Sequence, residues 1–252
     1  MQQQSNRVVL ITGGSRGIGA ATAVLCAQRG YAVAVNYSSN EDAAQQVVQQ
    51  ILGMGGRCVA VQADVAVEAE VMAMFDEVHA TLGQLTALVN NAGVVDFAAR
   101  VDEMSVARLK RMFEINVLGS FLCAREAVRR MSTRHGGAGG SIVNVSSIAA
   151  RLGGAGQYVD YAASKGAIDT FTLGLAREVA TEGIRVNAVR PGIIETEIHA
   201  SGGQPDRARQ MAPQVPLQRA GTALEVARAV VWLLSEESSY STGSLLDVAG
   251  GR

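Results

Sequence analysis

Short runs of β-branched and other apolar residues alternate with longer stretches of helical periodicity along almost the whole chain of 252 residues. The apolar runs lie at residues 8–11, 32–36, 58–61, 85–89, 141–145, 184–189 and 244–248. The helical patterns between them cover residues 17–29, 41–54, 68–82, 103–131, 157–181 and 223–234. Continuously apolar strands separated by helices are typical of a parallel sheet that helices cover on both faces. The pattern therefore predicts an α/β fold, a doubly wound parallel sheet in a single domain spanning residues 1–252.

Residues 195–218 break this alternation. They contain the pair Gly202-Gly203 and three of the four prolines of the chain, Pro205, Pro213 and Pro216. An irregular segment of this length inside a compact domain is usually a lid or a binding loop. We therefore expect residues 195–218 to lie over a site.

Composition and charge exclude several classes of function. The chain has 22 Lys and Arg residues against 23 Asp and Glu residues, which gives a formal net charge of −1 and no electrostatic reason to bind nucleic acid or an anionic membrane. Cys26, Cys58 and Cys123 are far apart, and the three histidines are scattered. We therefore expect free thiols, no metal site and no Ser-His nucleophile.

The N-terminal residues, Met1-Gln-Gln-Gln-Ser-Asn6, are polar and lack an apolar core of the kind found in signal peptides. No apolar run elsewhere reaches the length of a membrane span. We therefore expect a cytoplasmic protein with no membrane partner, in which residues 1–6 are disordered.

A glycine-rich turn, Thr12-Gly-Gly-Ser-Arg-Gly-Ile-Gly19, joins the first predicted strand to the first helix. Gly13 permits a sharp turn, Gly17 lets the backbone approach a pyrophosphate, and Gly19 lets helix and strand pack closely. The helix N-terminus adds free N–H groups and the positive end of its dipole. The spacing differs from the common G-x-G-x-x-G motif, but its place in the pattern predicts a nucleotide site that includes Ser15 and Ile18.

The residues after the second strand bear on the choice of cofactor. A carboxylate there would hold the ribose 2′-hydroxyl of NAD. This strand ends at Tyr37 and Ser38, and no acidic residue follows before Glu41. Arg16, inside the glycine-rich turn, is placed to meet a 2′-phosphate with the help of the Ser38 hydroxyl. The sequence therefore favours NADP(H) over NAD(H).

Further cofactor contacts are expected after the third and fourth strands. Asp64, followed by Val65, could bind an adenine amino group, although an Asp here could equally cap a helix or a turn. Asn90-Asn91-Ala92-Gly93 offers amides and small residues that allow close approach to a ribose, or a turn that ties neighbouring strands through side-chain hydrogen bonds. Both interpretations can hold for Asn90.

Tyr161 and Lys165 are four residues apart in a predicted helix and so project from the same face. A cation about 4 Å from the phenol, at an effective dielectric constant near 20, is worth roughly 4 kcal/mol. That energy would lower the pKa of the tyrosine, normally about 10, by up to about three units. Such a phenol could exchange a proton with a substrate oxygen near neutral pH, whereas a plain surface pair would have no chemical role.

Taken in order, these motifs resemble the short-chain dehydrogenase/reductase family, in its single-domain branch of Rossmann-like proteins, from Val8 to Gly251. The matching positions are Thr12-Gly13-x-x-x-Gly17-x-Gly19, Asn90-Asn91-Ala92-Gly93, Asn116, Ser147, Tyr161-x-x-x-Lys165 and Pro191-Gly192. The resemblance implies a homotetrameric oxidoreductase that moves a hydride between a nicotinamide and a small carbonyl or alcohol substrate.

The resemblance also implies a role for each matching residue. Tyr161 would donate a proton to a carbonyl or accept one from an alcohol, and Lys165 would lower its pKa and bind the nicotinamide ribose. Ser147, which the family pattern favours over its neighbour Ser146, would hold the substrate oxygen. Asn116 would bend its helix and anchor a water molecule that leads to Lys165.

After the sixth predicted strand, the resemblance implies a cradle for the nicotinamide. It begins at Pro191-Gly192, with the Ile194 backbone and the Thr196 hydroxyl at the carboxamide. In the absence of a cofactor, the same Pro-Gly pair would be a plain turn.

Several alternatives stay open at this point. Within the family, a 3-oxoacyl-thioester reductase competes with a sugar or polyol dehydrogenase, and the lid, which has no aromatic residues, tilts slightly towards a polar substrate. A protein that binds NADP(H) without catalysis, as a redox sensor or scaffold, is the alternative from another class. The helices at 103–131 and 157–181 are apolar beyond one stripe, which favours contact with another subunit.

Overall fold

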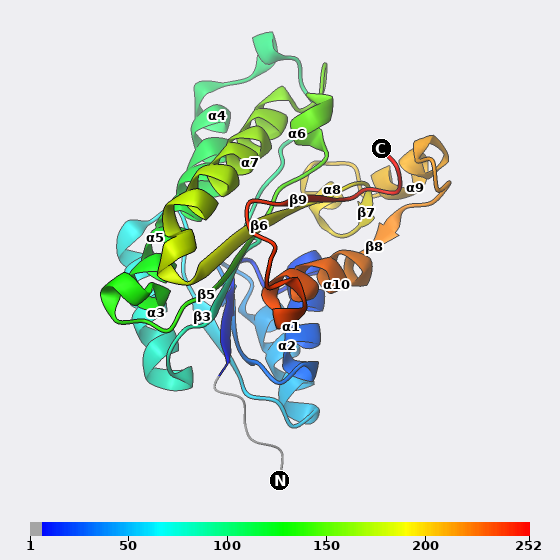
Figure 1. The fold of residues 1–252 in the computed structure, drawn as a ribbon. Coiled ribbons are helices and arrows are strands. Elements are labelled where there is room, and N and C mark those ends of the chain that lie inside the picture. The colour runs from blue at the N-terminus through cyan, green and yellow to red at the C-terminus, as the bar shows by residue number, and fades with distance from the viewer. Residues whose placement is uncertain (1–6) are drawn as a thin grey trace.

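Seven parallel strands form the central sheet of the computed structural model, which describes residues 7–252 (Figure 1). Their order across the sheet is β3-β2-β1-β4-β5-β6-β9. The strands are β1 (Val8–Ile11), β2 (Ala32–Tyr37), β3 (Cys58–Gln62), β4 (Ala87–Asn90), β5 (Gly140–Val145), β6 (Ile184–Pro191) and β9 (Leu245–Val248). The predicted doubly wound parallel sheet in one domain is confirmed. The expected disorder of residues 1–6 concerns a segment outside the described residues.

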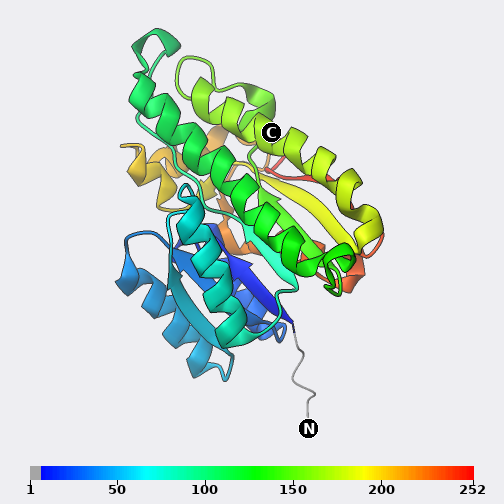
Figure 2. The same cartoon turned by 90° about the vertical axis from the view of Figure 1, so that its left-hand side faces the viewer.

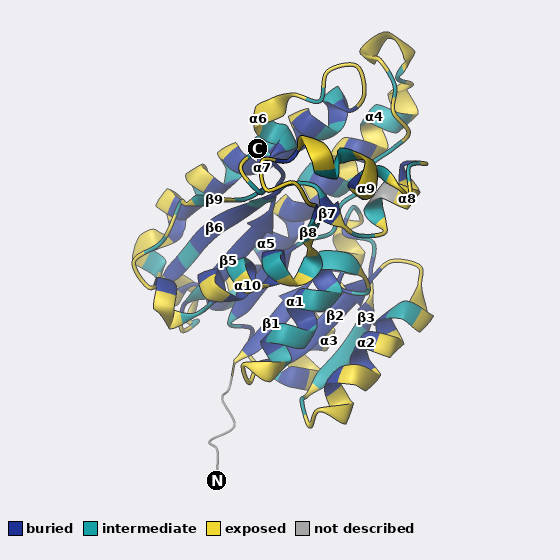
Figure 3. Ribbon diagram, turned by 90° about the vertical axis from the view of Figure 1, so that its right-hand side faces the viewer, coloured by how far each residue is buried: buried dark blue, intermediate teal, exposed yellow. Residues whose placement is uncertain are grey.

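Two layers of helices cover the sheet. On one face lie α3 (Glu68–Leu82), α5 (Gly119–Met131) and α7 (Val159–Val179), which Figure 2 shows in front of the strands. On the other face lie α1 (Gly17–Gln28), α2 (Glu41–Gly53) and α10 (Ala223–Leu234), which are visible in Figure 3. Each layer packs on its own apolar cluster, because strands buried on both faces supply alternate residues to the two cores.

Local signals in the sequence set where several helices begin. The Asn40 side chain accepts a hydrogen bond from the Ala43 N–H and so caps α2. Thr222 and Glu225 form a reciprocal capping box at the start of α10. Helix α1 has no side-chain cap. Its first N–H groups are therefore left for another partner.

The helix predicted at 103–131 is not continuous. The structure has a 3₁₀ turn (Val101–Glu103), then α4 (Val106–Phe113), a π-helical turn (Glu114–Leu118) and α5. Hydrophobic periodicity alone does not detect the π-helical turn, because the chain stays helical through it. The interruption contains Asn116, so the regular α-helix is broken at this residue, and the bend expected there stays a prediction.

Residues 195–218 leave the layered pattern, as predicted, but they are not wholly irregular. They contain the short helices α8 (Ile198–Ser201) and α9 (Arg207–Met211), next to a two-stranded ribbon of β7 (Ile194–Glu195) and β8 (Gly221–Thr222). Figure 3 shows this segment, hereafter the lid, beyond the ends of β2 and β1. Within residues 7–252, no helix has the length and apolar character to cross a membrane.

The contact between α1 and the loop after β4 generates a prediction about stability. A methyl group on Gly19 would overlap the Gly13 carbonyl oxygen and come within 2.6 Å of the Asn91 amide nitrogen. We expect Gly19→Ala to lower the free energy of unfolding by about 1–3 kcal/mol, as overpacking does. Urea denaturation followed by circular dichroism measures it.

Gly53→Ala is the matched control, since Gly53 lies in α2 with nothing within 4 Å of an added methyl group. It should stabilise the protein by up to about 1 kcal/mol through helix propensity. Equal unfolding midpoints for Gly19→Ala and the unmodified protein would contradict the close packing described here.

Candidate active site

A cleft of about 750 Å³ runs along the carboxyl ends of the strands and is closed on one side by the lid. It crosses the point between β1 and β4 where the strand order reverses, which is where ligands bind in open α/β sheets. Every site residue predicted from the sequence lines this cleft except Gly19 and Asn116. Gly19 packs behind the glycine-rich turn, and Asn116 is fully buried.

The glycine-rich turn has the shape that a pyrophosphate requires. Gly13 and Gly17 have positive φ angles of 59° and 53°, a region that favours glycine. A methyl group on Gly13 would come within 3.0 Å of the Ala92 backbone. Gly17 and Ile18 line the cleft at the uncapped start of α1. This end of the cleft therefore fits an anionic dinucleotide.

The rim after β2 carries no carboxylate. Tyr37, Ser38 and Asn40 line the cleft there, opposite the exposed Arg16 on the glycine-rich turn. The Asn36 side chain faces inward, and its amide oxygen accepts a hydrogen bond from the Gly13 N–H at 3.1 Å. This rim therefore presents hydroxyl groups and one guanidinium to a ligand.

Asp64 stabilises a turn through its side chain and also lines the cleft. One carboxylate oxygen accepts a hydrogen bond from the Ala66 N–H at 2.9 Å, which is the turn interpretation left open by the sequence. The Asp64 N–H donates to Glu70, and Val65 lies beside it on the cleft wall. A contact with adenine stays a prediction.

The two adjacent asparagines after β4 have different surroundings. Asn90 is buried and donates to the Asn144 side chain at 3.0 Å, so it ties β4 to β5, in agreement with one of its two interpretations. Asn91 donates to the carbonyl oxygens of Thr12 and Gly13, each at 2.9 Å. Asn91 therefore fixes the glycine-rich turn, while Asn90 fixes the sheet.

Ser147, Tyr161 and Lys165 meet on one wall of the cleft. Ser147 follows β5, and its side chain is near enough to the Tyr161 phenol to act on the pKa of that phenol. Lys165, one helical turn beyond Tyr161 in α7, places its ammonium 5.7 Å from the centre of the Tyr161 ring. The ammonium donates to the Val145 carbonyl oxygen at 2.8 Å, which holds this long side chain in place.

Burial controls the pKa values of this pair. It raises the pKa of the Tyr161 phenol above its usual value, against the smaller effect of the Ser147 side chain. It lowers the pKa of Lys165 to about 8, although the Asp169 carboxylate acts in the opposite direction. The predicted lowering of the Tyr161 pKa by Lys165 is therefore wrong for this structure. Burial removes the phenol from water, and this raises its pKa by more than a cation over the ring lowers it.

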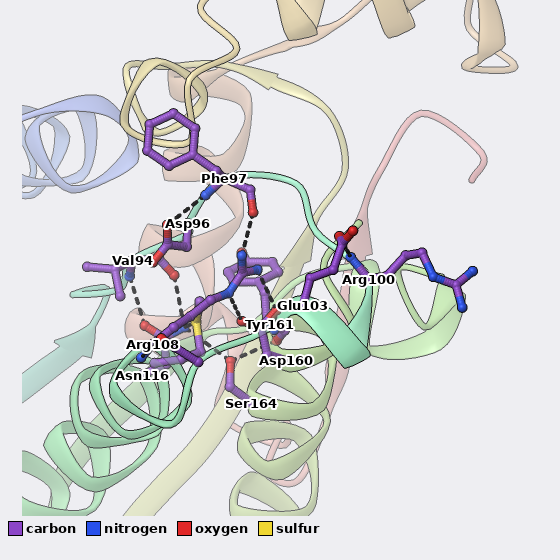
Figure 4. A network of polar contacts seen from close by, with 12 residues as sticks. Val94, Asp96, Phe97, Arg100, Glu103, Arg108, Asn116, Asp160, Tyr161 and Ser164 are labelled. Atoms are coloured by element: carbon purple, nitrogen blue, oxygen red, sulfur yellow. Dashed lines mark hydrogen bonds and ion pairs between the residues drawn. The ribbon is translucent and has the colours of Figure 1, made fainter. Parts of the chain in front are cut away.

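Asn116 lies behind the cleft wall and organises it (Figure 4). Its amide oxygen accepts from the Val94 N–H at 2.8 Å, and its amide nitrogen donates to the Val94 carbonyl at 3.0 Å and to the Ser164 hydroxyl at 3.1 Å. The residue thus joins the π-helical turn, the loop after β4 and α7. A methyl group on Gly93 would lie 3.4 Å from both the Asn116 oxygen and the Lys165 ammonium. The predicted water molecule between Asn116 and Lys165 stays a prediction.

A buried ion pair next to Tyr161 has no counterpart in the sequence analysis. Arg108 in α4 binds both carboxylate oxygens of Asp160, at 2.7 and 3.2 Å, and also donates to the Phe97 carbonyl at 2.6 Å (Figure 4). The Asp160 side chain is fully buried. Since Asp160 directly precedes Tyr161, the pair fixes the start of α7 against the loop after β4. Arg108 and Asp160 are 52 positions apart in the chain, and no sequence signal links them.

Sequence reasoning also missed one end of the cleft. Gln157 and Tyr158 at the start of α7, Leu152 of α6 (Ala149–Leu152), Arg207 of α9 and Arg252 all line it. A search for a tyrosine with a lysine four residues later passes over Tyr158, because that search detects only proton chemistry. Among the side chains that the structure describes, no group of three His, Cys, Asp or Glu residues is arranged to hold a metal ion.

Comparison with known proteins extends this picture over the full chain. Residues 13–252 match the family model described as enoyl-(acyl carrier protein) reductase. The uncharacterized oxidoreductase YgfF of Escherichia coli is 56% identical over 97% of this chain and 99% of its own length. The 3-oxoacyl-[acyl-carrier-protein] reductase FabG of Staphylococcus epidermidis is 37% identical over 98% of both chains. Glucose 1-dehydrogenase 2 of Bacillus subtilis is 36% identical over 98% of this chain and 95% of its own.

A solved structure agrees with these sequence matches. A double mutant of a Serratia marcescens short-chain dehydrogenase/reductase superposes with a TM-score of 0.90 at 34% identity, covering 98% of both chains. The matched region covers nearly the full length and so includes the glycine-rich turn and the Tyr-x-x-x-Lys segment of this chain. The chain therefore belongs to the short-chain dehydrogenase/reductase family of NAD(P)-dependent oxidoreductases.

Proposed function

We propose that this protein reduces a ketone to a secondary alcohol with NADP(H), and that Tyr161 donates the proton. The observation that carries the proposal is the meeting of Ser147, Tyr161 and Lys165 on one wall of a cleft whose other end is the glycine-rich turn. When bound, the nicotinamide supplies the hydride. The protein supplies the orientation and the proton.

Ser147, Tyr161 and Lys165 would each have a different role in the proton transfer. Ser147 and Tyr161 both line the cleft, where their hydroxyl groups would donate to a carbonyl oxygen as negative charge develops on it. A phenol with a raised pKa keeps its proton at neutral pH, which suits a proton donor better than a base. The buried Lys165 ammonium then stabilises the phenolate that the transfer leaves behind.

For the cofactor, we propose NADP(H) in preference to NAD(H). Support comes from the exposed Arg16 beside the glycine-rich turn and from a rim after β2 that has hydroxyl groups and no carboxylate. A guanidinium suits a 2′-phosphate, whereas a carboxylate at this rim would repel it. The remaining predicted cofactor contacts, from Asp64 to Thr196, line the same cleft.

We further propose a homotetramer in the cytoplasm. Exposed apolar side chains lie on two separate faces: Phe113, Leu118, Phe121 and Leu173 on α4 to α7, and Leu224, Trp232 and Tyr240 near α10 and β9. Two such faces support two kinds of contact between subunits. All three cysteines are free, which suits a reducing compartment.

For the substrate, the two classes stay open as proposals. The 3-oxoacyl-type reductase is supported by the likeness to FabG, and the sugar or polyol dehydrogenase by the likeness to glucose 1-dehydrogenase 2. Both classes place a carbonyl or hydroxyl group between Ser147 and Tyr161. The proposed chemistry is therefore common to them.

The cofactor proposal predicts the effect of Arg16→Ala. Loss of a charge-assisted contact worth about 1.5–3 kcal/mol should lower kcat/KM for NADPH roughly tenfold to a hundredfold. The value for NADH should change less than about threefold, because NADH offers no phosphate there. Steady-state kinetics with both cofactors measure the ratio of kcat/KM for NADPH to kcat/KM for NADH.

Arg29→Ala removes the same charge from the far end of α1, where the side chain is 58% exposed, and should leave the ratio unchanged. Equal losses with NADPH and NADH in Arg16→Ala would contradict a contact with the 2′-phosphate.

The Lys165 pKa predicts the pH dependence of carbonyl reduction. Above a pKa of about 8, the lysine loses its proton and no longer stabilises the phenolate, so kcat/KM should fall as pH rises through that value. Lys165→Arg keeps its charge at high pH and should move the fall to above about pH 10. NADPH oxidation between about pH 6 and 10.5 measures both profiles.

Lys110→Arg is the control, since Lys110 is exposed and is the only other lysine of the chain. Its profile should match that of the unmodified protein. If kcat/KM of the unmodified protein does not change with pH across the measured range, the proposed role of the Lys165 ammonium is contradicted.

A further inference from the structure

Arg207 of α9 brings a positive charge to the part of the cleft at the start of α7, where it contacts Gln157 and Tyr158. The acidic side chains on the cleft wall lie elsewhere: Asp64 follows β3, and a Glu197 oxygen lies 3.5 Å from the place of a methyl group on Gly17. The part of the cleft that α9 and the start of α7 form therefore has the Arg207 guanidinium, while Asp64 and Glu197 lie elsewhere on the described lining.

Arg207 is held firmly, but by neutral groups. It donates to the amide oxygens of Gln204 at 2.6 Å and Gln157 at 3.0 Å, and its guanidinium lies 5.0 Å from the centre of the Tyr158 ring. In the part of the chain that the structure describes, no Asp or Glu forms an ion pair with it. These contacts orient the side chain and leave its charge uncompensated.

Arg108, which does not line the cleft, is an arginine with a structural role near Tyr161 and offers a comparison. It is bound through two hydrogen bonds to the buried Asp160, which satisfies its charge within the protein. Arg207 instead is half-buried at the cleft and keeps N–H donors beyond the two that the glutamines accept, since a guanidinium has five. An oriented, partly desolvated guanidinium with spare donors suits a carboxylate or phosphate.

The position of Arg207 relates it to the reacting centre. Tyr158, beneath the guanidinium, precedes Tyr161 by three residues at the start of α7, and both line the cleft. Tyr158 is the N-cap of α7 and Tyr161 lies in its first turn, so less than one helical turn separates the two residues along the backbone. An anionic group on Arg207 would therefore belong to the same small molecule as a carbonyl at Tyr161.

We propose that Arg207 selects substrates that carry an anionic group, a carboxylate or a phosphate, a few bonds from the reacting carbonyl. The lid then does more than cover the cleft, because α9 brings the recognising charge and Gln157 and Tyr158 at the start of α7 orient it. This inference rests on the proposed carbonyl reductase function and narrows its substrate class. Arg207 would be a specificity-determining residue with no part in proton transfer.

Matched pairs of anionic and neutral ketones test the proposal. Levulinate is compared with methyl levulinate, and dihydroxyacetone phosphate with dihydroxyacetone, by NADPH oxidation. In the unmodified protein, kcat/KM should favour the anionic member of at least one pair by about tenfold or more, and the pair concerned identifies carboxylate or phosphate. Arg207→Gln should lower that preference about tenfold to a hundredfold, as loss of a charge-assisted hydrogen bond does. Arg207→Lys should retain part of it.

Arg209→Gln is the control, because Arg209 is exposed on the same short helix and does not line the cleft. It should leave the preference unchanged. Equal loss for the anionic and neutral members in Arg207→Gln would show that Arg207 only holds the lid, and would overturn the inference while leaving the reductase function intact. Absence of preference in both pairs would overturn it in the same way. If no ketone is reduced at all, the proposed function falls and this inference falls with it.

Discussion

The burial of Lys165 beside Tyr161 is the constraint on which the site depends. An ammonium in the interior needs a fixed partner, and the Val145 carbonyl at the end of β5 provides it. This bond ties α7 to the sheet and sets where Tyr161 enters the cleft. The same burial shifts the two pKa values in opposite senses, up for the phenol and down for the ammonium. The structure thus keeps the phenol protonated while the cation lies within reach of the phenolate that forms.

The shape of the rest of the cleft depends on asparagine side chains, which form hydrogen bonds with backbone groups that have no partner in the sheet. Asn36 and Asn91 bind the glycine-rich turn from the ends of β2 and β4, which lie on either side of β1, and Asn116 binds the loop after β4 from within a π-helical turn. Each amide satisfies buried donors and acceptors that a parallel sheet leaves open where its strands end. The cofactor end and the proton-transfer end are thereby parts of one hydrogen-bonded frame.

The sequence predicted the sheet, most helix limits and a set of site residues of which nearly all line the cleft, because apolar runs and glycine spacing are local signals. It missed the break at Glu114–Leu118, since a π-helical turn keeps helical periodicity. It also missed the Arg108–Asp160 pair and the Arg207–Tyr158 contact, because tertiary packing alone brings those residues together. The predicted lowering of the Tyr161 pKa was wrong because distance along a helix says nothing about desolvation.

The central claim is that Tyr161 gives the proton that completes hydride transfer. A single-turnover experiment tests it most directly, with NADPH bound in equal amounts to the unmodified protein and to Tyr161→Phe before a ketone is added. The account predicts rapid loss of NADPH absorbance in the unmodified protein and a rate slowed at least about a hundredfold in the variant, with unchanged NADPH affinity. Equal rates in the two proteins would contradict it.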